Sequence, residues 1–588
     1  MKSLYEYQIN QDKVGNSVTV AGWVSKRRDH GGVIFIDLRI SNNIIQAVIN
    51  PENKESFNIA ERLRSEYVVE VSGIVRERSK ENINENLPSG NVEIVVDKII
   101  LLNESKTPPF AINDLSVNED QRLKYRYIDM RGKQLQNNIR LRSKLIESIR
   151  NFFYSHDFID IETPILTKTT PEGARDYLVP SRVQAGDFFA LPQSPQIFKQ
   201  TLMIGGIDKY FQIARCFRDE DLRADRQPEF TQLDVELAFA NESIIETLIE
   251  SLFKNIFKDI LNEDVNNFER ISYFDALQKY GCDKPDLRNP LTMLDIKELV
   301  DKVEFKIFAD HVSKEDSRIV ALRVPGGGKL SRKEIDELTQ LVISCGSKGL
   351  AYLKCDTISD YDNGIISPIK KFLGRDVVNS LIKLTGSESG DIIFFSADKA
   401  NIVNTSMSTL IKKLGEHLNL VKSGWKFLWV TDYPLFEKID GSDSITSLHH
   451  PFTAPANNED LDSDNVLDIK SRAYDLVLNG HEIGGGSIRI HNPIIQKKVF
   501  ELLKLTEDEI ESKFGFFIEA LSYGCPPHGG IAFGIDRLAM LLLEANSIRD
   551  VIAFPKTQSA SCLLTNAPSS ISNLQLDELS LKIESKDE

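Results

Sequence analysis

Two features near the middle of the chain place charged side chains where they could bind a polar ligand. The segment CFRDEDLRADRQPEF (216–230) contains three arginines and five carboxylates, and strand-like sequence flanks it on both sides, so it is predicted to be the long tip of an antiparallel hairpin. In the strand that follows, Gln232, Asp234 and Glu236 alternate with apolar residues and share one face. This face is predicted to form the floor of a polar site. A sheet with one solvated face is the alternative, and surface loops are often charged.

A second cluster combines carboxylates with glycines in the segment HEIGGGSIRIH. Ser487, Arg489 and His491 are expected on one strand face, and the three glycines allow a ligand or another backbone to approach closely. Glu482 lies beside the glycines and Asp475 seven residues earlier. Two converging carboxylates suit a hard cation, most naturally magnesium carrying phosphates. Two unrelated surface acids would have the same spacing.

The third candidate is GGIAFGIDRLAMLLLEA (529–545), a glycine-rich strand followed by a helix. Its first helical turn carries Asp536 and Arg537. Glycines allow a base to stack on the backbone, and an arginine there can reach a phosphate, although an ordinary strand-to-helix turn has the same pattern. The stretch PGGGKLS (325–331) does not satisfy the P-loop pattern, because Lys329 is followed by leucine. It is predicted to be a flexible turn.

The elements around these clusters indicate several domains within 588 residues. Residues 1–105 are predicted to form a small five-stranded barrel of the oligonucleotide-binding type, with strands at 18–28, 33–40, 44–50, 67–78 and 92–102. On the second strand Phe35, Asp37 and Arg39 share a face that is expected to be solvated, downstream of the basic cluster Lys26, Arg27 and Arg28. An aromatic ring beside basic residues is what single-stranded RNA requires. A partly buried Phe35 beside solvated charges is equally compatible.

Composition narrows the possible classes of protein. The formal net charge of −16 argues against a protein that coats nucleic acid without specificity. The chain has no run of about 18 apolar residues, so a cytoplasmic location is expected. The six cysteines lie far apart without zinc-site spacing, so reduced thiols are expected.

Taken together, these segments resemble the three signature motifs of class II aminoacyl-tRNA synthetases: the helix and strand that end at Pro164, FRDEDLRADRQPEFTQLDVE, and GGIAFGIDR. Further segments, TPEGARDY, LPQSPQIFKQ, HHPFT and GGGSIRIHN, are similar to those of bacterial aspartyl-tRNA synthetases, in order along essentially the whole chain.

The resemblance implies an α+β multidomain fold. An N-terminal OB-fold β-barrel binds the anticodon, and an antiparallel six-stranded β-sheet with flanking helices forms the class II catalytic domain. The implied domains are the OB-fold (1–105), a hinge (106–135), the first catalytic part (136–285), a bacterial-type GAD-like α+β insertion (286–420), and the second catalytic part with a C-terminal extension (421–588). The implied partners are L-aspartate, ATP, tRNA-Asp and a second copy of the chain in a homodimer, with Mg²⁺ bound alongside ATP; neither DNA nor a membrane is implied.

The resemblance also implies roles for individual residues. Arg218 and Arg537 would be catalytic, on the α- and γ-phosphates. The ATP site would comprise Arg218, Asp219, Glu220, Gln227, Glu482, Gly534, Ile535, Asp536 and Arg537. The aspartate site would comprise Glu172, Ser194, Gln196, Lys199, Arg218, Asp234, His449, His450 and Arg489. Asp475 and Glu482 would hold the metal. The anticodon and tRNA-discriminating residues would be Arg28, His30, Phe35, Gln46, Glu81 and Glu93.

Some members of the family charge only tRNA-Asp, whereas others also charge tRNA-Asn. His30 within DHGG and Glu81 before Asn82 favour the second, non-discriminating type. The alternatives are a strictly tRNA-Asp-specific ligase, an asparaginyl or lysyl synthetase or asparagine synthetase relative with the same fold, and a catalytically silent RNA-binding paralogue. Lys199 and Arg489 favour a dicarboxylic substrate, because a guanidinium fork fits a carboxylate.

Overall fold

The computed structural model describes residues 9–41, 43–85, 87, 89–169, 173–221, 225–439, 442 and 444–584. The chain divides into two compact units. The first comprises Met1–Ser143, Leu222–Gln227 and Ala539–Ile571, and the second comprises Lys144–Asp221, Pro228–Leu538 and Ser572–Glu588. Helices α4 (Lys133–Ser155) and α15 (Ile535–Leu542) begin in one unit and end in the other. The domain boundaries expected from the sequence remain predictions.

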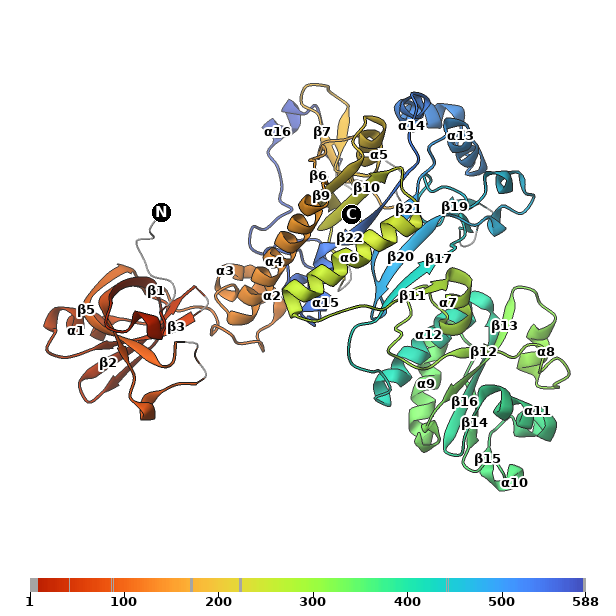
Figure 1. Cartoon of the computed structure of the whole chain (residues 1–588), viewed down its shortest axis with the longest axis horizontal. Helices are drawn as coiled ribbons and strands as arrows, with labels where there is room; N and C mark the ends of the chain where they lie inside the picture. The colour runs from red at the N-terminus through yellow and green to blue at the C-terminus, as the bar shows by residue number, and fades with distance from the viewer. Residues whose placement is uncertain are drawn as a thin grey trace. The chain divides into compact units, whose positions relative to one another are not determined.

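The first unit contains the expected five-stranded closed barrel, drawn in red and orange in Figure 1. Its strands run in the order β1-β2-β3-β5-β4. Ile34, Ile36 and Leu38 are fully buried because alternate side chains of a barrel strand point inward. The elements are η1 (Gln11–Lys13), β1 (Ser17–His30), β2 (Val33–Ile40), β3 (Asn43–Ile49), α1 (Lys54–Arg62), β4 (Val68–Glu77), η2 (Lys80–Asn82) and β5 (Val92–Asn103).

One expectation about β2 is wrong. Arg39 is buried, although its alternation with Ile36 and Leu38 indicated a solvated side chain. Its guanidinium forms a two-hydrogen-bond ion pair with Glu66, which comes from the loop before β4. A buried charge requires such a partner, and no local sequence pattern predicts a partner 27 residues away.

The segment after the barrel, expected to be a hinge, contains short helices. It contains α2 (Glu119–Lys124) and α3 (Arg126–Asp129), and η6 (Ile548–Asp550) lies in the same unit. Arg126 is buried, and its guanidinium donates to the carbonyls of Arg549, Ile552 and Ala553 at 2.8 to 2.9 Å. These contacts attach the segment to the C-terminal part of the first unit.

The second unit is built on an eight-stranded sheet in the order β11-β17-β20-β21-β22-β10-β9-β6. The six-stranded antiparallel sheet that the sequence implied is its centre, and β11 and β6 add a parallel strand at each edge. Phe217 pairs with Glu229, so the predicted hairpin with its charged tip is confirmed. The strands are β6 (Ile159–Asp160), β9 (Lys209–Phe217), β10 (Glu229–Ala238), β11 (Phe268–Ser272), β17 (Phe427–Thr431), β20 (Ala473–Leu478), β21 (His481–Ile488) and β22 (His528–Gly534).

Helix α6 (Glu242–Leu261) lies along this sheet (Figure 1) and buries one face. Its side chains at positions 245, 249, 252, 253, 256 and 257 are buried at the helical period. Phe239 follows the same alternation as the buried Leu233, Val235 and Leu237, but it is 75% exposed. The strand ends one residue earlier, and Phe239 has a φ of 57° that turns the chain toward α6.

The other elements of the second unit outside the insertion are α5 (Gln196–Ile204), α7 (Tyr273–Tyr280), α13 (Pro493–Leu502), α14 (Glu507–Ser522), α16 (Asn573–Glu578), η4 (Asn458–Asp462) and η5 (Val466–Asp468). Two small two-stranded sheets pair β7 (Leu178–Pro180) with β8 (Phe188–Ala190) and β18 (Phe436–Lys438) with β19 (Ile445–Ser447).

The insertion, green in Figure 1, forms its own five-stranded sheet in the order β12-β13-β16-β14-β15. Alternate residues of β13 enter two separate cores, with Val320 and Leu322 in one and Ile319 and Ala321 in the other. Its elements are β12 (Met293–Asp295), α8 (Lys306–Val312), β13 (Ser317–Val324), η3 (Gly327–Lys329), α9 (Arg332–Ser344), β14 (Ala351–Cys355), α10 (Tyr361–Gly364), β15 (Ile365–Ile366), α11 (Lys370–Thr385), β16 (Asp391–Lys399) and α12 (Ala400–His417).

The glycine-rich turn at 325–331 in this insertion, predicted to be flexible, is held by hydrogen bonds. Lys354 Nζ donates to the carbonyls of Gly328 and Leu330, so η3 is tied to β14. Within the described residues, no helix is long and apolar enough to span a membrane.

Candidate active site

The polar face of β10 carries a buried cluster of four alternating charges. Asp234 and Glu236 on β10 are completely buried, and Lys199 on α5 is 1% exposed. Lys199 Nζ lies 3.0 Å from Asp234 Oδ1 and 3.4 Å from Glu236 Oε2. Arg489, just after β21, donates from Nε (2.9 Å) and Nη2 (3.2 Å) to Glu236, and from Nη1 to Ser487 Oγ. The predicted polar floor is therefore an interior charge network rather than a solvated face.

Burial and charge pairing shift the pKa values of these carboxyl groups in opposite directions. Burial raises the pKa of the Asp234 carboxyl above its ordinary value, and the Lys199 ammonium offsets only part of that effect. Burial also raises the pKa of Glu236, but the Arg489 and Lys199 cations outweigh it, so the net pKa is lowered. Glu236 is thus held as a carboxylate that orients both cations.

Several polar atoms in this region have no hydrogen-bond partner among the described residues. They include Asp234 Oδ2, Gln196 Nε2, Ser447 Oγ, His449 Nδ1 and His450 Nε2. Buried polar atoms of folded proteins are nearly always paired. Such a concentration around one charge cluster indicates a site whose ligand supplies the missing partners. Asp234 Oδ2 is an acceptor suited to an ammonium group.

The pKa values of the two neighbouring histidines are shifted in opposite directions. His449 Nε2 lies 3.3 Å from Asp475 Oδ1; burial lowers the pKa of His449, but Asp475 outweighs it and the net pKa is raised. Burial, together with the positive charge of Arg489, lowers the pKa of His450 well below its ordinary value. The two imidazoles beside the same site therefore have pKa values shifted in opposite directions.

Asp475 on β20 and Glu482 on β21 form the expected carboxylate pair. The Tyr433 hydroxyl donates to Asp475 Oδ2 at 2.8 Å. Burial, followed by the charge of Asp475, raises the pKa of Glu482. A buried and a half-buried carboxylate that repel each other fit a hard cation. No group of three or more potential metal-ligating side chains occurs in the described part of the chain, so the other ligands would come from a substrate.

The glycines of β21 make room for this arrangement. A Cβ on Gly485 would lie 2.5 Å from Asp475 Oδ1, and one on Gly486 would lie 2.1 Å from the carbonyl oxygen of Gly530 on β22. The first glycine therefore admits a carboxylate and the second admits a neighbouring backbone, as expected from the sequence.

Arg218 begins the charged hairpin tip. Its backbone pairs with Pro228 across the hairpin, and its guanidinium lies 5.1 Å from the centre of the Phe230 ring. Nε of Arg218 is buried without a partner among the described residues. Asp219 pairs with the backbone of Arg175, and Glu220 is half-buried. An arginine that lies over an aromatic ring and has a buried Nε–H without an acceptor is suited to binding a phosphate.

The strand-to-helix turn of the third motif places Gly534, Ile535, Asp536 and Arg537 at the end of β22 and the start of α15. Arg537 Nη1 donates to the carbonyl of Glu482 at 2.7 Å, so this arginine lies at the carboxylate pair. Asp536 is buried and accepts a hydrogen bond from the Thr231 backbone. Ile535 is fully buried. Contact with a ligand is therefore more plausible for Arg537 than for its two neighbours.

Three further residues named from the sequence are Gln227, Glu172 and His491. Gln227 belongs to the first unit, where its amide exchanges hydrogen bonds with the backbone N–H and carbonyl of Lys556 at 2.7 and 3.0 Å. Glu172 lies outside the described residues. His491, predicted on the same face as Arg489, is exposed.

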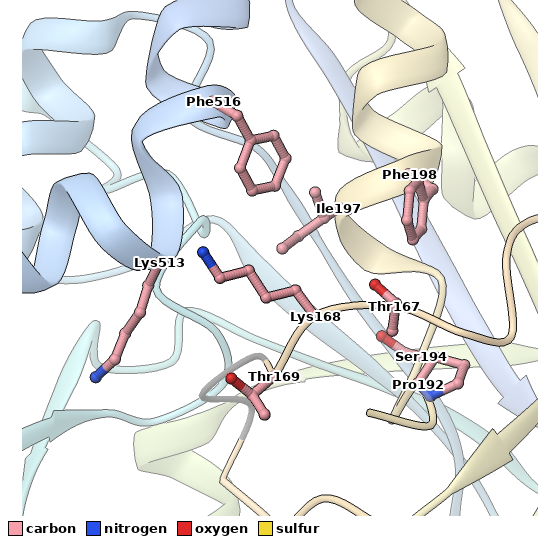
Figure 2. A pocket seen from close by; sticks show the side chains of 9 residues that line it. All are labelled: Thr167, Lys168, Thr169, Pro192, Ser194, Ile197, Phe198, Lys513 and Phe516. Carbon is pink, nitrogen blue, oxygen red and sulfur yellow. The ribbon is translucent and has the colours of Figure 1, made fainter. Parts of the chain in front are cut away.

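A small cavity of about 30 Å³ lies beside Ser194, whose hydroxyl accepts a hydrogen bond from the Gln196 backbone. Its lining combines apolar side chains with two lysines. In Figure 2, the Lys168 side chain runs past Ile197 and below Phe516, and its ammonium donates to the Ser512 carbonyl, whereas the ammonium of Lys513 points away from Ile197 and Phe516. The cavity therefore adjoins the segment that carries the aspartate-site residues.

The barrel groups most of the predicted anticodon residues. Arg28 donates to Asp37 (2.6 Å) and Gln46 (3.3 Å), and Gln46 donates to Glu93 (3.0 Å). The His30 and Phe35 rings meet edge to face at 5.8 Å. Glu81 is exposed on η2. Strand register explains the grouping, because Arg28 pairs with Phe35 and Gln46 with Glu93 across neighbouring strands.

Sequence reasoning placed Glu236 in the floor of the polar site without naming its partner, and it assigned no role to Tyr433, although both contact predicted site residues. The alternation in β10 did place Glu236 on the correct face. The alternation could not predict that Arg489 is the ion-pair partner of Glu236, because Arg489 lies 253 residues away. No local sequence pattern indicated that Tyr433 belongs to the site.

Comparisons with known proteins agree with these observations. Residues 118–558 match the class II tRNA synthetases (D, K and N), and residues 18–102 match the OB-fold nucleic acid binding domain. The aspartate-tRNA(Asp/Asn) ligases of Legionella pneumophila strains Philadelphia 1 and Corby are each 54% identical over 587 residues, with 99% of both chains covered.

Solved structures show the same fold. The asparaginyl-tRNA synthetase from Pyrococcus horikoshii, complexed with asparaginyl-adenylate, has a TM-score of 0.58 at 19% identity and covers 95% of this chain and 98% of its own. A putative aspartyl-tRNA synthetase from Leishmania major has a TM-score of 0.57 at 20% identity, covering 94% and 95%. The chain therefore belongs to the class II tRNA synthetases of the D, K and N group. Within that group it is a member of the aspartate-tRNA ligase family.

Proposed function

We propose that this chain activates L-aspartate with ATP to form aspartyl-adenylate. It then transfers the aspartyl group to the 3′ end of tRNA-Asp and tRNA-Asn. The observation that carries the proposal is the buried Lys199–Arg489 pair, held by Asp234 and Glu236 and surrounded by unpartnered polar atoms. A substrate side-chain carboxylate bound to these two cations completes the site. Asp234 Oδ2 accepts from the substrate ammonium.

The reaction requires alignment and charge neutralisation rather than a covalent nucleophile. The α-carboxylate oxygen of aspartate attacks the α-phosphorus, and pyrophosphate leaves. A ribose hydroxyl of the terminal adenosine then attacks the acyl carbon, and AMP leaves. Arg218 neutralises the α-phosphate and Arg537 the γ-phosphate. Asp219, Glu220, Gln227 and the backbone from Gly534 to Asp536 complete the proposed ATP site.

The carboxylate pair Asp475 and Glu482 is proposed to hold Mg²⁺, which when bound would neutralise phosphate charge. The raised pKa of Glu482 supports this assignment, because a neighbouring cation would relieve the repulsion between the two carboxylates. His449, whose pKa is raised by Asp475, lies beside the same carboxylates.

Rejection of asparagine follows from the same geometry. A neutral amide offers one acceptor oxygen in place of two, carries no negative charge, and places an NH₂ donor against Lys199 and Arg489, which are donors only. Dicarboxylic substrates are therefore favoured over asparagine or lysine, whose synthetases share the fold.

Charging of tRNA-Asn is supported by His30, which contacts Phe35, and by Glu81. The printed names of the Legionella relatives include both tRNAs. We also propose a cytoplasmic homodimer. Tyr154, Ile159, Ile165 and Leu166, which surround the edge strand β6, are 42 to 51% exposed and offer an apolar surface for a second copy.

The test is aspartate charging of separately purified tRNA-Asp and tRNA-Asn by the same preparation. Comparable charging of both is expected. Charging of tRNA-Asp alone would identify the strictly specific ligase. Aspartate-dependent ATP–pyrophosphate exchange is measured alongside, because its absence would identify the silent RNA-binding paralogue. Arg218→Ala is expected to abolish exchange, and near-normal exchange would remove Arg218 from its assigned role.

A further inference from the structure

A cluster of four residues joins the barrel to the segment that leads into α4. Trp23 on β1 and Arg39 on β2 are cross-strand partners in the barrel, and Glu66 lies just before β4. Arg131 comes from outside the barrel, two residues before α4 begins. All four lie in the first compact unit.

Glu66 is the centre of the cluster. Its carboxylate accepts from Arg39 at 3.1 and 2.5 Å and from Arg131 Nη1 at 2.7 Å. Both guanidinium groups also lie over the Trp23 ring, with distances of 5.7 Å for Arg39 and 5.3 Å for Arg131 to its centre. One carboxylate and one indole ring therefore bind two arginines that belong to different segments.

Burial makes this joint rigid. Glu66 is only 3% exposed, and its backbone has a φ of 67° and donates to the Val24 carbonyl. Removing Arg131 would leave Glu66 paired with Arg39 alone, so the barrel could keep its own fold. A second contact, from Arg140 on α4 to the Ser41 hydroxyl at 2.9 Å, ties α4 to the turn after β2.

We infer that Arg131 and Glu66 are positioning residues for the tRNA step. They hold the barrel, which carries the proposed anticodon residues, to the segment that begins α4 within the first unit. The inference rests on the proposed function. A tRNA that binds at its anticodon and at its 3′ end gains from a stiff connection, because stiffness raises the effective concentration of the second contact. Amino-acid activation requires neither contact.

Arg131→Met tests this, because it removes the ion pair and the charge over Trp23 but keeps the length of the side chain. The expected result is a KM for full-length tRNA-Asp that is roughly tenfold higher. Aspartate-dependent ATP–pyrophosphate exchange and thermal unfolding should be unchanged. Charging of an acceptor-stem minihelix, which lacks the anticodon arm, should also be unchanged.

Arg375→Met is the matched control. Arg375 also pairs with a carboxylate, Asp362 at 3.1 Å, and lies over an aromatic ring, Tyr361 at 4.6 Å, but in the insertion. It should leave the KM for tRNA unchanged. Arg131→Lys, which keeps the charge, should restore part of the affinity for full-length tRNA.

Three results separate the possibilities. A raised KM for full-length tRNA alone supports the positioning role. An unchanged KM, or an equal rise with the minihelix, would overturn it. Absence of exchange in the unaltered protein would overturn the proposed function and this inference with it.

Discussion

At the scale of single residues, Glu236 is central to amino-acid binding. It is completely buried and is the only described carboxylate that contacts both Arg489 and Lys199. Its position explains how two cations can remain close together in the interior before a substrate arrives. Because each cation keeps a fixed orientation, the substrate carboxylate meets a prepared site.

Glu236→Gln is expected to raise the KM for aspartate by roughly thirtyfold, since leaving a buried cation short of a partner costs about 2 kcal/mol. Discrimination against asparagine should fall as well. ATP–pyrophosphate exchange at varied concentrations of aspartate and asparagine measures both quantities. Glu242→Gln is the control, because Glu242 forms an equivalent two-hydrogen-bond pair with Arg472. Equal effects of the two substitutions would contradict the role of Glu236.

At the scale of elements, the central sheet positions the site through close approach of its strands. β20, β21 and β22 bring Asp475, the glycines and the Gly530 backbone together. Adjacent glycines on β21 therefore meet different neighbours, and alanine substitution at each should have a different consequence.

Gly485→Ala meets a side chain that can shift, so it is expected to cost less than about 1 kcal/mol of unfolding free energy and to raise the Mg²⁺ concentration needed for activity. Gly486→Ala meets backbone and should cost about 3 kcal/mol or more. Urea unfolding and magnesium titration of exchange measure the two effects. The assignment of Asp475 to the metal site would be wrong if Gly485→Ala left the magnesium requirement unaltered.

At the scale of the whole molecule, the exposed apolar residues around β6 form the surface proposed above for a second copy. β6 is an edge strand of only two residues, so its backbone and neighbouring side chains are available for pairing. Exposed apolar clusters of this kind mark interfaces more often than isolated exposed residues do.

Ile159→Lys is therefore expected to convert the protein to a monomer in sedimentation experiments, because a lysine ammonium cannot be buried without a partner. Ile494→Lys on α13, where the isoleucine is 73% exposed, is the control and should leave the assembly state unchanged. A dimer that persists in the Ile159 variant at low micromolar concentration would place the interface elsewhere.

The sequence by itself determined the barrel, the charged hairpin and the strand-to-helix turn, because each depends on residue alternation and turn residues within short segments. It also placed Asp234 and Glu236 on one face for the same reason. Only the tertiary structure decided that this face is buried, that Glu236 holds Arg489, and that Arg39 and Arg131 share Glu66. These facts depend on pairings between residues 27 to 253 positions apart. Desolvation and charge pairing act through space, so local periodicity carries no information about them.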